Sequence, residues 1–376
     1  MKINIIILMQ VFLFSLMGKA NAQSLIDNAA TKESLALYQN LHKLSKKHTM
    51  FGHQDDLAYG ANWKYVPGKS DIKDIVNDFP AVYGWDIAGL ELDAANNIDG
   101  VSFDKMRQYI KDGYKRGGVI TISWHFNNPL SGGSSWDTTK NAVASILPGG
   151  IKHELYKNWL DKAAVFMATL KGDQGEAIPI LFRPFHELIG NWFWWGKNTC
   201  SPAELKEAWR FTVDYLRNEK KMHNLIYVYN TNGVSNEEAF LERYPGDSYV
   251  DVVSFDLYQF AAQDKNVFID SVKHELQILT AIASQKNKLA AFAETGFEAV
   301  PDPEWWTGTL WPAIKDFQLS YVLVWRNAGY MPSIQKMHYY APFKGQVSAP
   351  DFKKFYKLRK IMFEKKLRRK NIYQSR

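Results

Sequence analysis

The chain has 376 residues, of which 46% are hydrophobic and 23% are charged. These are ordinary globular values, so they exclude a disordered chain and provide apolar side chains for a large core. The formal net charge is +7, but residues 353–376 alone hold 11 Lys or Arg and a single acid, which leaves a net charge of −3 on the rest. A positive total therefore does not indicate that the body of the protein binds nucleic acid.

The first 22 residues have the pattern of a secretory signal peptide. Lys2 precedes a mostly apolar run over residues 5–17, and residues 20–22 form a small-residue cleavage site. We expect export to the periplasm or the exterior, and no membrane span in the mature protein, because no second apolar stretch of sufficient length follows. Cys200 is the only cysteine, so no disulfide can form within the chain.

Residues 23–376 are predicted to form a single catalytic domain with an α/β fold. A helical opening over 24–47 precedes eight β-branched or aromatic runs, each followed by a helical pattern. The runs are 49–54, 81–86, 118–125, 178–187, 225–230, 250–258, 289–294 and 321–326. Eight strands alternating with helices favour a (β/α)8 TIM barrel, with an open doubly wound sheet as the alternative.

The segment that ends the fourth strand is the richest in chemistry. Glu187 closes the sequence Phe-Arg-Pro-Phe-His-Glu, and three tryptophans follow within residues 190–196. A carboxyl group beside aromatic rings is partly desolvated, which raises its pKa and suits it to donate a proton near neutral pH. The structural alternative is that Glu187 caps a helix or pairs with Arg183.

A second carboxylate, Glu294, ends the seventh strand after a run of small apolar residues. Glu187 and Glu294 are expected to face one another across the mouth of the barrel. Glycoside hydrolysis needs such a pair, about 5–5.5 Å apart for retention of configuration and about 6.5–9.5 Å apart for inversion. The pair is a stronger indication than either residue alone.

The basic C-terminus is predicted to be a last amphipathic helix followed by a solvated tail. Phe352, Phe355, Tyr356 and Phe363 would point inward. Binding of nucleic acid or anionic lipid by this tail is the alternative.

Together these motifs resemble glycoside hydrolase family 26, whose members are chiefly β-mannanases on barrels with glutamates on strands four and seven. The similarity spans nearly all of residues 23–376. The matching segments are Phe51-Gly52-His53-Gln54, Ser123-Trp124-His125, Arg183 to Glu187 with Trp192 and Trp194-Trp195-Gly196, Ser254 to Tyr258, Glu294-Thr295-Gly296 and Trp325-Arg326-Asn327.

The resemblance implies a retaining endo-β-1,4-mannanase acting on mannan, glucomannan or galactomannan. Glu187 would be the general acid/base and Glu294 the nucleophile. His186 would orient Glu187 or contact the sugar, Tyr258 would hydrogen-bond the nucleophile, and Trp325 would lie under the sugar at the cleavage point.

Three further side chains are implied to bind substrate. Arg326 and His125 would contact sugars on the non-reducing side, and Trp192 would line the cleft near the acid/base. No cofactor or metal motif is present, so none is expected, and a monomer is the default. For His53 and Trp124, a packed structural role and substrate contact both remain open.

Three rival interpretations also fit parts of this pattern. Imidazoles from His53, His125 and His186 could serve a metal-dependent hydrolase. Exposed tryptophans would also suit a non-catalytic carbohydrate-binding protein. Within the family, a β-1,3-xylanase or mixed-linkage β-glucanase would keep the barrel and both glutamates.

Overall fold

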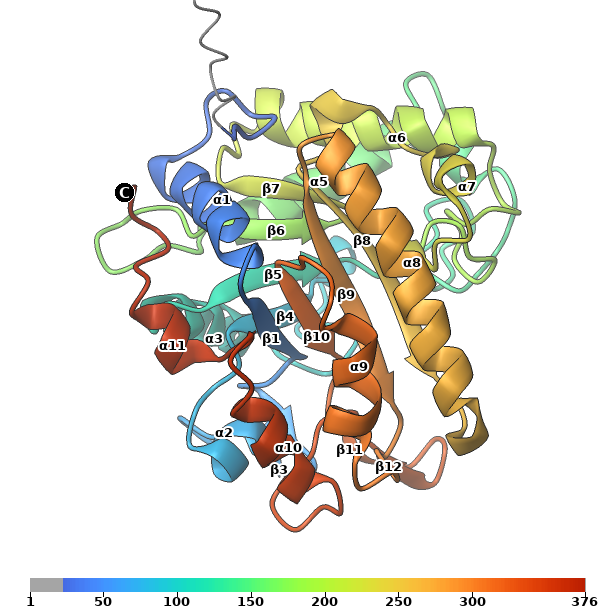
Figure 1. Cartoon of the computed structure of the whole chain (residues 1–376). Helices are drawn as coiled ribbons and strands as arrows, with labels where there is room; N and C mark the ends of the chain where they lie inside the picture. The colour runs from blue at the N-terminus through green and yellow to red at the C-terminus, as the bar shows by residue number, and fades with distance from the viewer. Residues whose placement is uncertain (1–22, 376) are drawn as a thin grey trace, which may run out of the picture.

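The computed structural model describes residues 23–375 (Figure 1), so the predicted signal peptide lies outside the described residues. Eight parallel strands lie in the order in which they occur along the chain, and the last pairs with the first, so that the sheet closes into a barrel. The barrel strands are β1 (Thr49–Gln54), β4 (Val82–Asp86), β5 (Val119–Ser123), β6 (Ile180–Arg183), β7 (Leu225–Asn232), β8 (Val252–Gln259), β9 (Leu289–Phe297) and β10 (Tyr321–Val324). The (β/α)8 prediction is confirmed, and the open-sheet alternative is wrong because β1 and β10 are paired through four residues.

Alternation along the strands divides the buried side chains between two layers. In β7, Ile226 and Val228 belong to the cluster inside the barrel, whereas Tyr227 and Tyr229 pack in the larger cluster between strands and helices. Successive side chains of a strand point to opposite faces, so both faces of these strands are apolar. The resulting core contains no disulfide, and Cys200 is a free, buried thiol.

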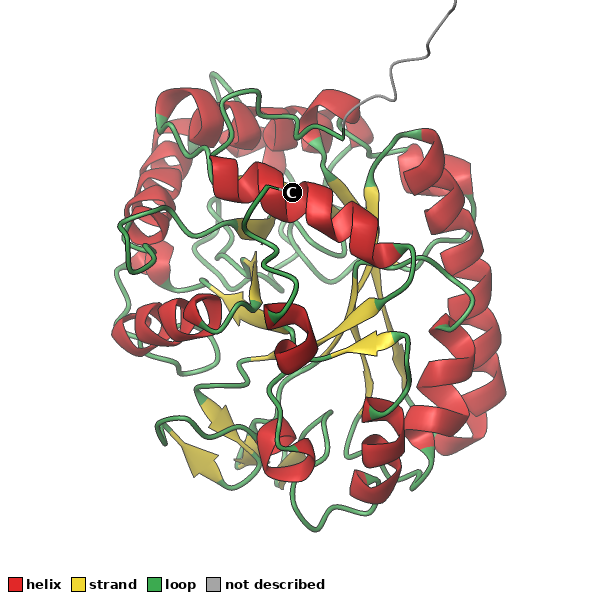
Figure 2. Ribbon diagram, turned by 60° about the vertical axis from the view of Figure 1, so that its left-hand side comes forward, coloured by secondary structure: helices red, strands yellow, loops and turns green. Residues whose placement is uncertain are grey.

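Helices surround the barrel in the second layer (Figure 2). They are α1 (Lys32–Ser45), α2 (Asp71–Val76), α3 (Phe103–Lys115), α4 (Ala142–Ile146), α5 (His153–Ala168), α6 (Pro202–Asp214), α7 (Glu237–Leu241), α8 (Lys265–Gln285), α9 (Trp311–Ile314), α10 (Ala349–Tyr356) and α11 (Glu364–Arg368). Local sequence fixes several starts: α6 begins with a capping box between Ser201 and Glu204, with Pro202 in its first turn. Within residues 23–375, no helix is long and apolar enough to cross a bilayer.

Most predicted strands agree with the structure to within a few residues, but two boundaries were wrong. The opening helix begins at Lys32 instead of residue 24, because the Thr31 side chain caps it by accepting from the Ser34 N–H. The fourth strand ends at Arg183, because Phe185 and Glu187 have positive φ angles of 47° and 51°, which extended strands do not permit.

The C-terminal prediction was right about an amphipathic helix and about the burial of Phe352, Phe355 and Phe363, but wrong about the solvated tail. In place of one helix and a solvated tail, α10 is followed by the short strand β13 (Ile361–Met362), which pairs with β1, and then by α11. Leu367 and Ile372 are buried in the barrel-side core, and the Asn40 side chain donates to the Ile372 carbonyl at 2.9 Å. Apolar residues spaced among the cations anchor the tail to the barrel. The sequence-based prediction considered only the charges of the tail and so missed these residues.

Two small hairpins follow β1 and β10. They are β2 (Tyr59–Gly60) with β3 (Trp63–Lys64), and β11 (Gly329–Met331) with β12 (Lys336–His338). Because both follow barrel strands, they lie with the other strand-to-helix connections at the carboxyl end of the barrel, where barrel enzymes build their sites.

Candidate active site

Glu187 lies in the turn after β6 with its backbone and carboxylate both held. Its N–H donates to Asn230 Oδ1 at 3.0 Å, and the indole Nε1 of Trp192 donates to its Oε2 at 2.6 Å. Burial, and secondarily the charge of Glu294, raises the pKa of Glu187 to about 7, against the lowering effect of the Trp192 hydrogen bond. A glutamate of this kind can both donate and accept a proton near neutral pH.

Glu294 lies on β9 with only 4% of its surface exposed. The hydroxyl of Tyr258, on β8, donates to Glu294 Oε2 at 2.9 Å, and the guanidinium of Arg183 donates to Oε1. Both oxygens therefore act as acceptors, and the side chain is fixed from the adjacent strand β8 and from β6 across the barrel.

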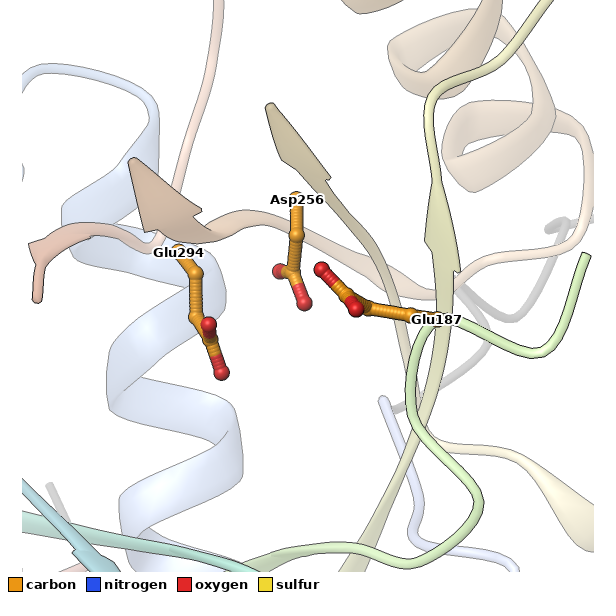
Figure 3. Close-up of side chains that lie close together, drawn as sticks. All are labelled: Glu187, Asp256 and Glu294. Carbon is orange, nitrogen blue, oxygen red and sulfur yellow. The ribbon is translucent and has the colours of Figure 1, made fainter. Parts of the chain in front are cut away.

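Three carboxylates converge at this end of the barrel (Figure 3). One oxygen from each of Glu187, Asp256 and Glu294 lies within 4.8 Å of the other two. With nearest oxygens within 4.8 Å of each other, Glu187 and Glu294 fit the spacing of about 5–5.5 Å in retaining glycosidases better than the about 6.5–9.5 Å of inverting ones.

A buried polar network supports the carboxylates from beneath. Arg183 Nη1 donates to Asp256 Oδ2 at 2.8 Å and to Asn230 Oδ1 at 3.1 Å, so Arg183 pairs with Asp256 and Glu294 instead of Glu187. The amide of Asn230 also donates to Ser254 Oγ and to Asp256 Oδ1, each at 2.9 Å.

The sequence interpretation gave no site role to Asn230 or Asp256. Their positions in the sequence could have indicated a site role. Asn230 is a polar residue at the carboxyl end of the fifth strand, and Asp256 stands two residues before Tyr258. Because carboxyl ends of parallel barrel strands meet at one face, both positions were candidates for the site.

Two histidines are linked to each other beside the carboxylates. His125 Nδ1 is 2.7 Å from Asp86 Oδ2, and His125 Nε2 is 2.9 Å from His186 Nε2. Burial favours neutral His125, but Asp86 outweighs it and raises the His125 pKa, whereas burial followed by the charge of His125 lowers the pKa of His186. The hydrogen bond between the two Nε2 atoms fixes the His186 ring against His125.

Aromatic rings line the space next to these groups. Trp192 is 40% exposed, and the ring of Trp325, directly after β10, meets His125 edge-on at 6.3 Å between centroids. Trp136, which the sequence analysis did not single out, is 50% exposed and stacks on His125 at 5.4 Å. Partly exposed indoles offer flat apolar faces on which a pyranose ring can pack.

Arg326 is held beside the aromatic rings by an acidic partner. Its Nε lies 3.1 Å from Asp99 Oδ1, and both side chains are largely buried. Asp55, at the end of β1, belongs to the same charged group, since burial and then Asp99 raise its pKa while Arg326 lowers it. Neither acid was anticipated, because Asp99 stands in a loop with no motif around it and Asp55 lies just outside the segment Phe51-Gly52-His53-Gln54.

His53 and Trp124 are packed side chains. His53 Nδ1 is 2.7 Å from Asp56 Oδ1, Trp124 Nε1 donates to Glu91 Oε2 at 3.0 Å, and both residues are almost fully buried. Of the two roles left open by the sequence, this geometry supports the structural one.

The metal site of the rival interpretation, built from His53, His125 and His186, does not form among the described residues. In residues 23–375 the group close enough to hold a cation is Glu187, Asp256 and Glu294. Two of these carboxylates already bond the Arg183 guanidinium, which compensates their charge without a metal. The eight predicted site residues, by contrast, all lie on or just after the carboxyl ends of barrel strands.

Known proteins share this architecture. The model for glycosyl hydrolase family 26 matches residues 26–298. A β-mannanase of that family from Bacteroides ovatus has a structure with a TM-score of 0.85 and 44% identity, covering 90% of this chain and 97% of its own. An endo-β-1,4-mannanase from Cellulomonas fimi gives a TM-score of 0.84 at 31% identity, over 94% of this chain and 80% of its own.

A curated relative from Bifidobacterium adolescentis, named mannan endo-1,4-beta-mannosidase, is 38% identical over 290 residues. The match covers 74% of this chain but only 28% of that protein, so this chain spans little more than a quarter of the relative's length. The family model and the full-length structural match agree on the same assignment. The chain belongs to glycosyl hydrolase family 26.

Proposed function

We propose that this protein is a retaining endo-β-1,4-mannanase that cleaves internal bonds of mannan, glucomannan or galactomannan. The observation that carries the mechanism is the close approach of Glu187 and Glu294, with the pKa of Glu187 raised to about 7. The names of the Bacteroides, Cellulomonas and Bifidobacterium relatives support β-mannan as the substrate.

In the first step Glu294 attacks the anomeric carbon, and Glu187 gives its proton to the departing sugar oxygen. The bond to the leaving sugar breaks as the bond to Glu294 forms. In the second step Glu187, now ionised, takes a proton from water, and the resulting hydroxyl displaces Glu294 from the anomeric carbon. The anomeric configuration is inverted twice and therefore retained.

The surrounding side chains have supporting roles in this proposal. Tyr258 holds the nucleophile through its 2.9 Å hydrogen bond, and Trp325 forms the platform beneath the sugar at the cleavage point. His125 and Arg326 contact sugars on the non-reducing side. Trp192 lines the cleft on the side of the acid/base, to which its indole donates.

His186 is proposed to contact the sugar through the edge of its ring that carries Nδ1. This nitrogen is buried without a hydrogen-bond partner among the described residues, whereas Nε2 bonds His125. A sugar hydroxyl can both donate and accept, so it would satisfy this nitrogen in either tautomer of the ring.

The proposal also includes export and independence of any cofactor. The pattern of residues 1–22 supports cleavage of a signal peptide and a periplasmic or extracellular location. A monomer that needs no metal is proposed, and full activity after exhaustive dialysis against a chelator would support the second part.

Product analysis by chromatography tests the function. Purified protein is incubated with locust bean gum, konjac glucomannan, barley β-glucan and β-1,3-xylan, beside a Glu294→Ala control. Manno-oligosaccharides from the first two substrates, absent in the control, are the expected result. Products only from β-glucan or xylan would overturn the substrate, and no product from any polymer would favour a carbohydrate-binding protein.

A further inference from the structure

The end of the barrel opposite the carboxylates carries a concentration of cations. The amino ends of all eight strands meet there, together with the segment after α10, whose strand β13 pairs Thr49 with Ile361. The Thr49 N–H also donates to the Lys360 carbonyl at 2.9 Å, which joins the end of α1 to the C-terminal segment. Figure 1 shows α1, α11 and the C-terminus on this side of the molecule.

Seven exposed cationic side chains of this region are here called the basic face. They are Lys46, Lys47, Arg359, Lys365, Lys366, Arg368 and Arg369. Lys365, Arg368 and Arg369 line one hollow of the surface, and Arg359 lies close enough to Lys366 to act on its pKa. The pKa of His48 is lowered first by burial and then by Lys366, and the pKa of Lys366 is lowered by burial and then by Lys370 and Arg359.

Carboxylates of the fold do not neutralise the basic face. None of its seven side chains forms an ion pair with an acid among residues 23–375. Two acids packed against this segment, Glu364 and Asp78, are buried: Glu364 accepts from Tyr83 and pairs with Arg116, and Asp78 accepts from the Lys365 N–H. The positive potential is therefore directed into solvent.

The basic face also lacks exposed rings and large apolar side chains. Every large hydrophobic residue that is exposed in the described chain lies outside residues 43–48 and 357–375. Unstacked nucleic acid bases bind on exposed aromatic rings, and insertion into a bilayer needs an apolar anchor, so neither mode fits. A purely electrostatic contact with a dense layer of anions fits both the charge and the absence of rings.

We propose that the basic face docks this protein on the surface of an anionic phospholipid bilayer, with the carboxylate-bearing end of the barrel turned away from the lipid. Lipid phosphates supply the anions that the fold does not. The predicted signal peptide directs the chain across a phospholipid bilayer. Binding to lipid does not depend on the proposed mannanase activity. The value of an active site that faces the solvent does rest on that proposed function.

Vesicle co-sedimentation tests the proposal with full-length mature protein. The probes are phosphatidylglycerol mixed with phosphatidylcholine and phosphatidylcholine alone, at about 0.1 M and about 0.5 M salt. The test variant carries Arg359→Gln, Arg368→Gln and Arg369→Gln, whose side chains make no hydrogen bond or ion pair with the described residues. A matched variant carries Lys140→Gln, Lys197→Gln and Lys344→Gln, three exposed lysines on loops at the other end of the barrel.

The unmodified protein is expected to bind only the anionic vesicles, and only at the lower salt. Each basic residue near such a surface contributes about fivefold, so the arginine variant should bind on the order of 100-fold more weakly, while the lysine variant keeps most of its affinity. Equal loss in both variants would show that only net charge matters and would overturn the docking face. Binding to neutral vesicles, no binding to anionic ones, or tighter binding to duplex DNA at equal phosphate would each overturn the lipid assignment.

The orientation has a separate readout. Protein bound to anionic vesicles should hydrolyse soluble galactomannan at the rate of free protein, because the site faces the solvent. Loss of hydrolysis on binding would contradict the orientation, whereas no hydrolysis by the free protein would instead contradict the proposed function.

Discussion

Replacing Glu187 by Gln should make the protein more stable at alkaline pH but not at acidic pH. The folded state raises the pKa of Glu187 from 4.5 to about 7 through burial and the charge of Glu294, so folding costs free energy once the group is ionised. Below the unfolded pKa both states hold the proton and the cost is absent. It grows as the pH rises through the interval and is complete above the folded pKa.

The size of the effect follows from the width of that interval. At 1.36 kcal/mol for each pH unit, the rise in pKa corresponds to about 3 kcal/mol of destabilisation at pH 8 that Gln would remove. Gln also keeps an oxygen that can accept from the Trp192 indole. The assay is urea unfolding of the Gln variant and the unmodified protein at about pH 4.5 and about pH 8, with Glu207→Gln on the exposed side of α6 as control.

The difference in unfolding free energy between the Glu187 variant and the unmodified protein should increase by about 2–3 kcal/mol between the two pH values. The control should show no such increase. Titrating groups that do not interact with Glu187 are common to both proteins and cancel in the comparison, whereas Asp256, whose pKa is raised mainly by burial and also by Glu187, adds to the difference in the same direction. A difference that is independent of pH would refute the assigned proton affinity of Glu187.

Three substitutions test the neighbours of the carboxylates. Trp192→Phe removes the 2.6 Å hydrogen bond that favours ionised Glu187, so the pKa of Glu187 should rise. The alkaline limb of the kcat/KM profile should therefore move to higher pH by about half to one unit. An unmoved limb would show that this hydrogen bond does not tune the acid. Tyr258→Phe removes one hydrogen bond to Glu294, so it should lower kcat by about 10–100-fold. The free energy of unfolding should change by less than about 1 kcal/mol. Unchanged steady-state kinetics would contradict the role of Tyr258 in holding the nucleophile. Asn230→Ala removes four hydrogen bonds from a fully buried position. It should lower the free energy of unfolding in urea by about 3–4 kcal/mol. A loss below about 1 kcal/mol would show that the network is not needed for the fold.

The barrel was predictable from the sequence because its signal is repeated. Eight short apolar runs, each followed by a helical pattern, leave few alternatives to a parallel sheet, and the length of the chain favours closure. Boundaries were less accurate where a single backbone conformation decides them. The positive φ angles of Phe185 and Glu187 end β6 early, and nothing in the residue types of that segment announces them.

Glu187 and Glu294 were predictable for a similar reason, since each stands at the end of a recognisable strand beside unusual residues. The groups that hold them were harder to find. Asn230, Asp256 and Asp99 come from different parts of the chain, and their value depends on contacts with Arg183 and Arg326 that only the folded barrel creates.

The tail shows the opposite limitation. Its charge was obvious, but Leu367 and Ile372, which fix it against the barrel, are isolated apolar residues among cations. A count of charges over a segment averages out such anchors, although two of them are enough to order a short strand and a helix. The same ordering presents the cations as a surface in place of a flexible extension.

The most direct test of the central claim is identification of the side chain that forms the glycosyl-enzyme intermediate. A 2-fluoro mannosyl substrate slows the second step, so the intermediate can be digested and its labelled peptide sequenced by mass spectrometry. The account predicts that Glu294 carries the sugar. A label on Glu187 or on Asp256, the third carboxylate of the cluster, would contradict the assignment of roles, since all three lie close enough for attack at the same anomeric carbon.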